Sequence, residues 1–309
     1  MELEVYKVRQ YHANIELLLQ QKGGVLASLV RQESQSSEKD FYEQMGSVVA
    51  EQVDTRFAPS PQANTPLDRR MNTIAPYHVG DFLDNFERVQ TLADPSSMIV
   101  QNFVRALGRE RDRVTFQAIF GTAYTGKEGT TSVTWPTTVS TSSGGVRVDE
   151  SFGTANSGLI LAKLIEAKRA WLANFNDPEE EQPHVIINSA GLADLLNTTE
   201  VRSVDYNSVK ALVSGSVDSF MGFMFKPWEG YILDGTNVMR GTSAGSGSET
   251  IDRYPVFTKS SILHATGKEI TTEITRRADR SFHWYAYASA MFGATRMQEL
   301  KIIEIEAKR

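Results

Sequence analysis

The stretch DYNSVKALVSGSVDSFMGFMFKPW, residues 205–228, changes its hydrophobic period halfway along. Its first half carries apolar residues at helical spacing and predicts a short helix that ends near Gly215. Its second half, 217–225, is a nearly unbroken apolar run and predicts a strand that is buried on both faces. No ionisable side chain lies between Asp218 and Lys226. The stretch therefore indicates a structural unit of a mixed α+β fold and not a catalytic site.

Composition limits the class of protein. The chain has 309 residues, of which 40% are hydrophobic and 23% charged, with a net charge of −6, and this predicts a soluble protein of one large or two ordinary domains. The mild acidity gives no global signature of nucleic-acid binding, and no window approaches the roughly 18 apolar residues of a membrane helix. The first 25 residues lack the basic start and apolar centre of a secretory signal. The absence of cysteine excludes disulfides and a thiolate nucleophile.

The first 80 residues do not read as a self-contained domain. Residues 1–50 have a helical but poorly packed pattern, which predicts an arm that needs another surface, or a modest helical hairpin. Residues 51–80 contain four prolines and predict a long extended loop or a two-stranded excursion. Aromatic and arginine side chains in this segment favour a surface that docks on something: Arg56, Phe57, Arg69, Arg70 and Tyr77.

The clearest long helix follows this segment. Asp94 is placed to cap it and Pro95 to occupy its first position. Apolar residues then recur at helical spacing until Gly121, so the sequence predicts a helix over 95–120, roughly 39 Å long. Its middle is rich in arginine, which predicts either a solvated face or a basic stripe that contacts neighbours or phosphates. The arginines are Arg105, Arg109, Arg111 and Arg113.

The rest of the chain alternates short helices with strands, as in a mixed α+β layer. A glycine- and threonine-rich segment at 121–151 predicts a hairpin-like insertion, and a helix is expected from Asn156 or Ser157 to Asp177. A helix capped by Ser189 is expected over 189–197. The expected strands are 184–188, 231–238, 256–257, 262–263, 270–274, 282–287 and 300–305.

Two motifs suggest enzymes, but their contexts do not fit. GTAYTGK at 121–127 has the spacing of a phosphate loop, yet it follows a helix, and Glu128 stands where the motif needs Ser or Thr. GTSAG at 241–245 matches a nucleophile elbow, but a flexible glycine–serine segment follows it. A serine hydrolase using Ser243 is the alternative from another class, and a carbohydrate-binding β protein is a weaker third. The histidines never fall within metal-ligand spacing of one another, so we expect no metal and no cofactor. They are His12, His78, His184, His264 and His283.

The order of these segments resembles the major capsid protein of tailed double-stranded DNA phages, the Hong Kong 97-type coat fold. TPLDRRMNTIAPYHVGDFLDNFERVQTLADPSSMIVQNFVRALGRERDRVTFQAIFG, residues 65–121, is similar to the extended-loop return and spine helix of that family. The helix–strand unit at 205–225 and the terminal AYASAMFGATR…LKIIEIE extend the resemblance. It covers roughly residues 50–306. The individual motifs are moderately specific, and their order along the chain is more specific.

The resemblance implies an α+β fold of defined parts. These are an N-terminal arm (1–50), an extended loop (51–80), a peripheral domain (81–150) with a spine helix (95–120) and an insertion (121–150), an axial domain (151–254), return strands of the peripheral domain (255–295) and a C-terminal strand (296–309). The insertion is expected to be either an exposed decoration or a contact between capsomers.

The implied function is structural, without catalytic residues or cofactors. Copies would assemble in the host cytoplasm into hexamers and pentamers of an icosahedral virion shell that encloses double-stranded DNA non-specifically, with no membrane. The implied partners are further copies of the chain, a separate scaffolding protein and a portal. A protein nanocompartment shell of the same fold is the alternative. The expected contacts between subunits are Arg56, Phe57, Arg69, Arg70, Tyr77, Arg109, Arg113, Asp205 and Lys210.

Two departures from the family pattern refine these expectations. Some members cross-link their subunits through a lysine in the extended loop, but no lysine lies between Lys39 and Lys127. We therefore expect no cross-link of this kind. We also find no long scaffolding extension ahead of the arm, so we expect either a separate scaffolding protein or an extension that has been removed.

Overall fold

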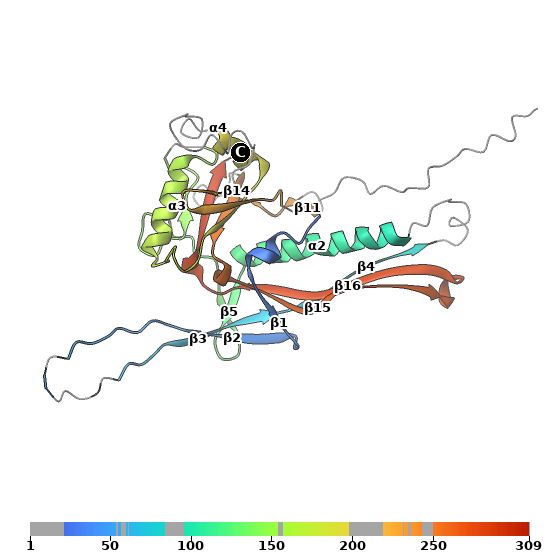
Figure 1. Ribbon diagram of the computed structural model, residues 1–309, viewed down its shortest axis with the longest axis horizontal. Helices are drawn as coiled ribbons and strands as arrows, with labels where there is room; N and C mark the ends of the chain where they lie inside the picture. Colours follow the sequence, from blue (N-terminus) through green and yellow to red (C-terminus); the bar gives the residue numbers. More distant parts are fainter. Residues whose placement is uncertain are drawn as a thin grey trace, which may run out of the picture.

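The computed structural model describes residues 22–53, 55–56, 60, 62–83, 96–153, 157–197, 219–230, 232–233, 236–242 and 250–308. Its longest helix, α2 (Ser96–Phe120), runs along a four-stranded sheet (Figure 1). The strand order is β1-β15-β16-β4. Only the β1–β15 pair is parallel. The strands are β1 (Arg31–Ser34), β15 (Ile262–Arg277), β16 (His283–Arg296) and β4 (Ala75–Leu83). We call α2 and this sheet the spine layer.

Small side chains on β16 allow α2 to lie close to the sheet. Phe103 and Leu107 of α2 pack against alternate alanines of β16, such as Ala286 and Ala288. Successive residues of a strand face opposite sides, so these alanines line one face of the sheet. The helix begins one residue after the predicted start and ends where predicted, so the sequence prediction of 95–120 is confirmed. The proposed cap at Asp94 lies outside the described residues.

A second body, which we call the lobe, is built on a seven-stranded sheet with the order β7-β17-β14-β8-β10-β9, with β13 paired to β14. Helix α3 (Leu161–Ala173) packs on it through Leu164, Ala167 and Trp171, which are fully buried. The remaining elements of the lobe are β7 (Arg147–Val148), α4 (Ser189–Asn197), β8 (His184–Ile187), β9 (Ser219–Phe220), β10 (Phe223–Pro227), β11 (Ile232–Leu233), β12 (Thr236–Asn237), β13 (Arg240–Thr242), β14 (Thr250–Phe257) and β17 (Ile302–Lys308).

A third sheet carries the long hairpin that projects from the body in Figure 1. Its order is β2-β3-β5-β6, all antiparallel. The strands are β2 (Lys39–Met45), β3 (Leu67–Thr73), β5 (Ala123–Thr125) and β6 (Thr131–Val133). The described residues also form four single turns of 3₁₀ helix: η2 (Leu26–Leu29), η3 (Lys259–Ser261), η4 (Ala278–Arg280) and η5 (Glu299–Lys301). The predicted insertion is thus built into two sheets, through β5 and β6 here and β7 in the lobe.

The structure corrects the reading of the first 80 residues. The part of 1–50 that is described contains η2, β1 and β2, whereas the residues that carry the helical pattern, 5–19, lie outside the described residues. The excursion begins with β2, whose residues 39–45 pair with β3, and not at residue 51. Strand β4, which we had included in the loop, belongs to the spine layer.

The strand predicted at 217–225 is also corrected. A turn at Met221 and Gly222, both at positive φ, divides the described part into β9 and β10. In β10, Phe223 and Phe225 are buried while Met224 is exposed, so only one face of the strand is covered. The preceding predicted helix lies outside the described residues.

Smaller differences concern boundaries. Helix α3 begins at Leu161, later than predicted. Helix α4 has the predicted span, but Asn188 is the residue whose side-chain oxygen accepts a hydrogen bond from the backbone N–H of Gly191 (2.8 Å). The predicted tail strands are real but longer, and β14, β17 and β7 all join the lobe sheet. The lobe therefore draws strands from outside the range 151–254.

Candidate assembly surfaces

The hairpin is anchored to the body by a buried arginine at the end of β16. Arg296 is fully buried and lies next to the C-terminal end of α2. Its guanidinium donates hydrogen bonds to the carbonyl oxygens of Ile119 (2.8 Å), Gly121 (2.7 Å) and Val133 (3.0 Å). The last carbonyls of a helix lack partners within the helix, and a cation there also suits the helix dipole. Arg296 thus joins the end of α2 to β6.

A carboxylate couples this arginine to the hairpin. Glu299 accepts from Arg296 Nε through one oxygen (3.1 Å) and from Arg70 Nη2 through the other (2.9 Å). Arg70 lies on β3, is only 6% exposed, and also donates from Nε to the carbonyl oxygen of Met297 (3.2 Å). A charge that is removed from water needs such partners. We call this part of the hairpin, with Arg70, Arg296 and Glu299, the hairpin root.

Buried amides hold the root on its other side. Asn72 Nδ2 donates to Gln35 Oε1 (2.8 Å), and the Gln35 amide donates in turn to the carbonyl oxygens of Ser37 (2.9 Å) and Glu38 (3.2 Å). Both amide side chains are buried. These bonds connect β3 to the turn between β1 and β2. The direction in which the hairpin leaves the body is thereby fixed by polar contacts at its root.

The far end of the hairpin is different in character. The β2–β3 ladder ends at the pair Met45–Leu67, followed by a hydrogen bond from Gly46 N to the Pro66 carbonyl oxygen (2.8 Å). The exposed large apolar residues beyond and at the end of this ladder are Met45, Val48, Val49, Val53 and Leu67, and we call them the far-end set. Val49 is 88% exposed. Figure 1 shows this segment extended away from both other bodies. Exposed apolar side chains of this kind mark a surface that binds something else.

The contact residues predicted from sequence fall in different environments. Arg56 is exposed, and Phe57 lies outside the described residues. Arg69 is partly exposed, with its guanidinium over the Phe41 ring at 5.6 Å. Arg70 is buried at the root, so it contacts its own chain and we no longer propose it as a contact with a neighbour. Tyr77 is half-buried and stacks on Phe292 with ring centroids 4.5 Å apart.

The arginines of α2 are mostly engaged within the chain. Arg113 forms an ion pair with Glu110 and donates from Nη1 to Gln117 Oε1 (2.6 Å). Arg111 donates from Nε to Nε2 of the buried His264 (3.0 Å). Arg109 is half-buried. This arrangement favours the interpretation of a solvated, internally paired face. Asp205 and Lys210 lie outside the described residues.

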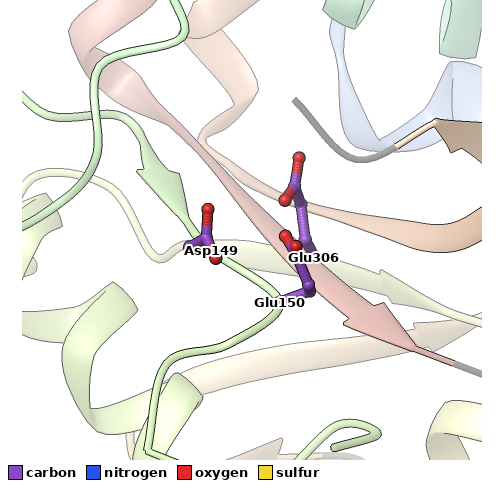
Figure 2. Close-up of side chains that lie close together, drawn as sticks. All are labelled: Asp149, Glu150 and Glu306. Atoms are coloured by element: carbon purple, nitrogen blue, oxygen red, sulfur yellow. The ribbon is translucent and has the colours of Figure 1, made fainter. Parts of the chain in front are cut away.

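Three carboxylates meet in the lobe: Asp149, Glu150 and Glu306 (Figure 2). Arg147 Nη1 lies 3.1 Å from Asp149 Oδ2 and 3.0 Å from Glu306 Oε2. Lys163 is fully buried nearby, and desolvation lowers its pKa to about 8 although the carboxylates oppose this. Its ammonium donates to the Glu306 carbonyl oxygen (3.0 Å). Because two cations already balance most of this charge, the cluster is accounted for as an internal ion network joining β7, α3 and β17.

The structure removes the context that either enzyme motif would need. The phosphate-loop-like segment 121–127 leads into the β5–β6 hairpin and not into a helix. The elbow-like segment begins in β13, whose Gly241 and Thr242 pair antiparallel with Ile251 and Thr250 of β14. The chain therefore returns as a strand where an elbow requires a helix. Ser243 itself lies outside the described residues. Within the described part of the chain, no helix has the length and apolar character to cross a membrane.

A family model decides the identity of the chain. The model described as phage capsid protein matches residues 4–308. The chain belongs to this family. It is a structural major capsid protein, and the nanocompartment and hydrolase alternatives are not favoured. No curated protein matches the chain closely enough to count as a relative.

Solved capsid structures share this fold. The chain is similar to the capsid of cyanophage Pam1, with a TM-score of 0.71 at 12% identity, over 100% of this chain and 98% of that one. The capsid of Helicobacter pylori bacteriophage KHP30 gives 0.72 at 10% identity, over 99% and 96%. The capsid of cyanophage P-SCSP1u gives 0.69 at 14% identity, over 98% and 93%. At such low identity the likeness concerns the fold alone, and it covers nearly the whole length of each chain.

Sequence reasoning missed the hairpin root of this capsid protein. FGATR at 292–296 is part of the family resemblance, but nothing in the sequence indicates that its arginine caps α2. The one available signal was charge in an otherwise apolar strand, since Arg296 ends a run of small and aromatic residues. Glu299, three residues later, gave no signal of its own.

Proposed function

We propose that this capsid protein assembles with copies of itself into the hexamers and pentamers of an icosahedral shell, and that hairpin β2–β3 bridges neighbouring subunits. One observation carries the proposal: the hairpin is held rigidly at its root and presents the far-end set to water, away from its own body. An apolar surface that the chain cannot cover itself needs another molecule. Contacts of one copy with the next in head-to-tail fashion close into rings around a symmetry axis.

Membership of the phage capsid family supports the remaining parts of the proposal. The shell encloses double-stranded DNA without sequence preference, and a separate scaffolding protein and a portal take part in assembly in the host cytoplasm. The role is structural and includes no catalytic step. Within the hairpin we propose Arg56 and Arg69 as contacts, together with Phe57. We also propose Tyr77, Arg109, Arg113, Asp205 and Lys210 as contacts; Tyr77 and Arg113 additionally contact residues of their own chain.

The hairpin can be tested without disturbing its root. We propose replacing residues 47–65 by an Asn-Gly turn, which suits a two-residue hairpin connection. The root contacts of Arg70 and Asn72 are left in place, so we expect an unchanged circular dichroism spectrum and an unchanged melting temperature of the unassembled subunit. We expect no closed shells by negative-stain microscopy or sedimentation. The full-length chain, with the candidate scaffolding protein added, is the reference. Normal shells from the shortened chain would show that the hairpin does not bridge subunits.

A further inference from the structure

A phenylalanine at the end of α3 is exposed to water in a backbone conformation that suits glycine. Phe175 has φ +61° and a side chain that is 97% exposed. Helices often end with a residue in this left-handed region, and it is usually glycine, because a side chain costs free energy there. Within the described chain nothing covers the ring. A strained residue that gains no contact in its own chain invites a functional reason.

The backbone that carries the ring is held in place by hydrogen bonds. The backbone N–H of Phe175 donates to the carbonyl oxygen of Leu172 (3.0 Å). The amide of Asn176 donates to the carbonyl oxygens of Trp171 (2.8 Å) and Leu300 (2.9 Å). The turn is therefore tied both to its own helix and to η5. A side chain that is ordered in advance loses less entropy when it binds.

Phe175 extends an apolar stripe along α3. Ile165 is 51% exposed and Leu172 is 44% exposed, and their spacing of seven residues places both side chains on one side of the helix. Phe175 lies three residues after Leu172, just beyond the helix end, and the backbone of Leu300, whose side chain is 47% exposed, is bonded to the next residue, Asn176. We call these four residues the α3 stripe. The opposite side of α3 is fully buried in the lobe, so the helix cannot turn to bury the stripe.

Leu300 joins the stripe to the hairpin root along the chain. Leu300 directly follows Glu299, which holds Arg70 of β3 and Arg296. Figure 1 shows α3 on the side of the molecule toward which the hairpin projects. A neighbour that lies along the hairpin on this side is therefore near α3.

The charges around the stripe suit a second copy of the chain. Lys168 and Arg169 flank it on the helix, while the loop that follows carries exposed acidic residues, Asp177, Glu179 and Glu180. Because positive and negative side chains both surround the stripe, they can pair with a protein surface that carries charges of both signs. It does not suit a uniformly negative partner such as DNA.

We propose that the α3 stripe is a contact between subunits, occupied by the same neighbouring copy that the hairpin reaches. This inference rests on the proposed assembly into a shell. It adds a second contact on the lobe, so that the neighbour is held at two separated places. Two weak contacts with the same neighbour together bind it more tightly than either contact alone, provided that both can form at once.

Phe175→Gly separates folding from assembly. Glycine accepts the left-handed conformation without strain, so we expect the unassembled subunit to melt at the same or a higher temperature than the wild type. We expect the subunit concentration needed for assembly to rise about tenfold or more, as for the loss of a large buried side chain at an interface. Phe175→Tyr, which keeps the ring, is the matched control and should assemble near the wild-type concentration.

A photo-crosslinking amino acid at position 175 identifies the occupant. In assembled particles we expect an adduct of twice the subunit mass whose second peptide, by mass spectrometry, comes from this chain, and no such adduct in unassembled subunits. Unchanged assembly of Phe175→Gly would refute the inference, as would an adduct formed only with a different protein. If wild-type chains form no shells under any condition, the proposed function fails first, and the two failures are thus distinguished.

Discussion

The root and the far end of hairpin β2–β3 are built on opposite principles. At the root, Arg296 is fully buried and its three nitrogens bind carbonyl and carboxylate oxygens of other segments. At the far end, Val49 is 88% exposed and the regular strand pairing has ended. The difference separates the contacts that stabilise the folded subunit from those that can stabilise its association with another molecule. Contacts that stabilise the subunit are concentrated at the root, while the far-end set can contribute only when another molecule covers it.

The largest expected effect comes from breaking the root. Arg296→Leu removes the donors to α2 and β6 and leaves Glu299 with Arg70 alone. An acceptor left without its donor typically costs about 1–3 kcal/mol. The carbonyl oxygens of Ile119, Gly121 and Val133 all lose Arg296, which gives about 3–5 kcal/mol in total. We expect a loss of this size in the free energy of unfolding, measured by urea denaturation of the unassembled subunit.

A matched control uses an arginine whose ion pair is exposed. Arg277 contacts Asp279 at 3.0 Å at the other end of the same sheet, where water screens the pair. Arg277→Leu should leave the unfolding curve unchanged. If both substitutions had equal effects, burial at the root would not be the source of its stability.

The spine layer should respond to acid through His264, and the far end should not. His264 is fully buried, and burial together with the nearby Arg111 guanidinium lowers its pKa to about 4. It accepts a hydrogen bond from Arg111 at Nε2, which places the ring proton on Nδ1, facing the Thr115 hydroxyl at 3.1 Å. Protonation would put two cations side by side in the interior.

The sign of this effect follows from the two states. Between pH 6.5 and about 4 the unfolded chain binds a proton that the folded chain refuses, so stability falls as the pH is lowered through this window. The slope is about 1.4 kcal/mol per pH unit for one proton. We expect the stability difference between wild type and His264→Gln to shift by about 3 kcal/mol in favour of the variant over this range. If the free energies of unfolding of wild type and His264→Gln changed with pH in the same way, His264 would not be the group that titrates.

The spine helix could be predicted from sequence because its signals are local. The repeat of apolar residues and the glycine at its end lie within the helix or next to it, and α2 was placed to within one residue. The hairpin could not be placed as well, because the partner of each strand is distant and its register is set by the root. Strand β2, for example, falls in the segment predicted as an N-terminal arm.

Arg69 and Arg70 show why the site was harder than the fold. Both had been predicted as contacts with a neighbour, yet adjacent residues of a strand point to opposite faces. Arg70 points inward, where it pairs with Glu299. This partner lies 229 residues later in the chain. Residue type alone does not reveal such a partner. The same is true of Phe175, whose left-handed backbone conformation just past the end of α3 cannot be recognised from the residue type.

The smallest effect on subunit stability is expected at the far end. Replacing Val48, Val49 and Val53 together by serine changes side chains that already lie mostly in water. Exposed substitutions of this kind usually change the free energy of unfolding by less than about 0.5 kcal/mol. Shell formation should nevertheless fail or need a higher subunit concentration, because the apolar area available to a neighbour is lost. Replacing the same three valines by isoleucine keeps that area and should preserve assembly, as measured by sedimentation. If the serine variant unfolded more easily than the wild type, the far-end set would also stabilise the subunit. The division between a root that stabilises the subunit and a far end that serves assembly would then be wrong.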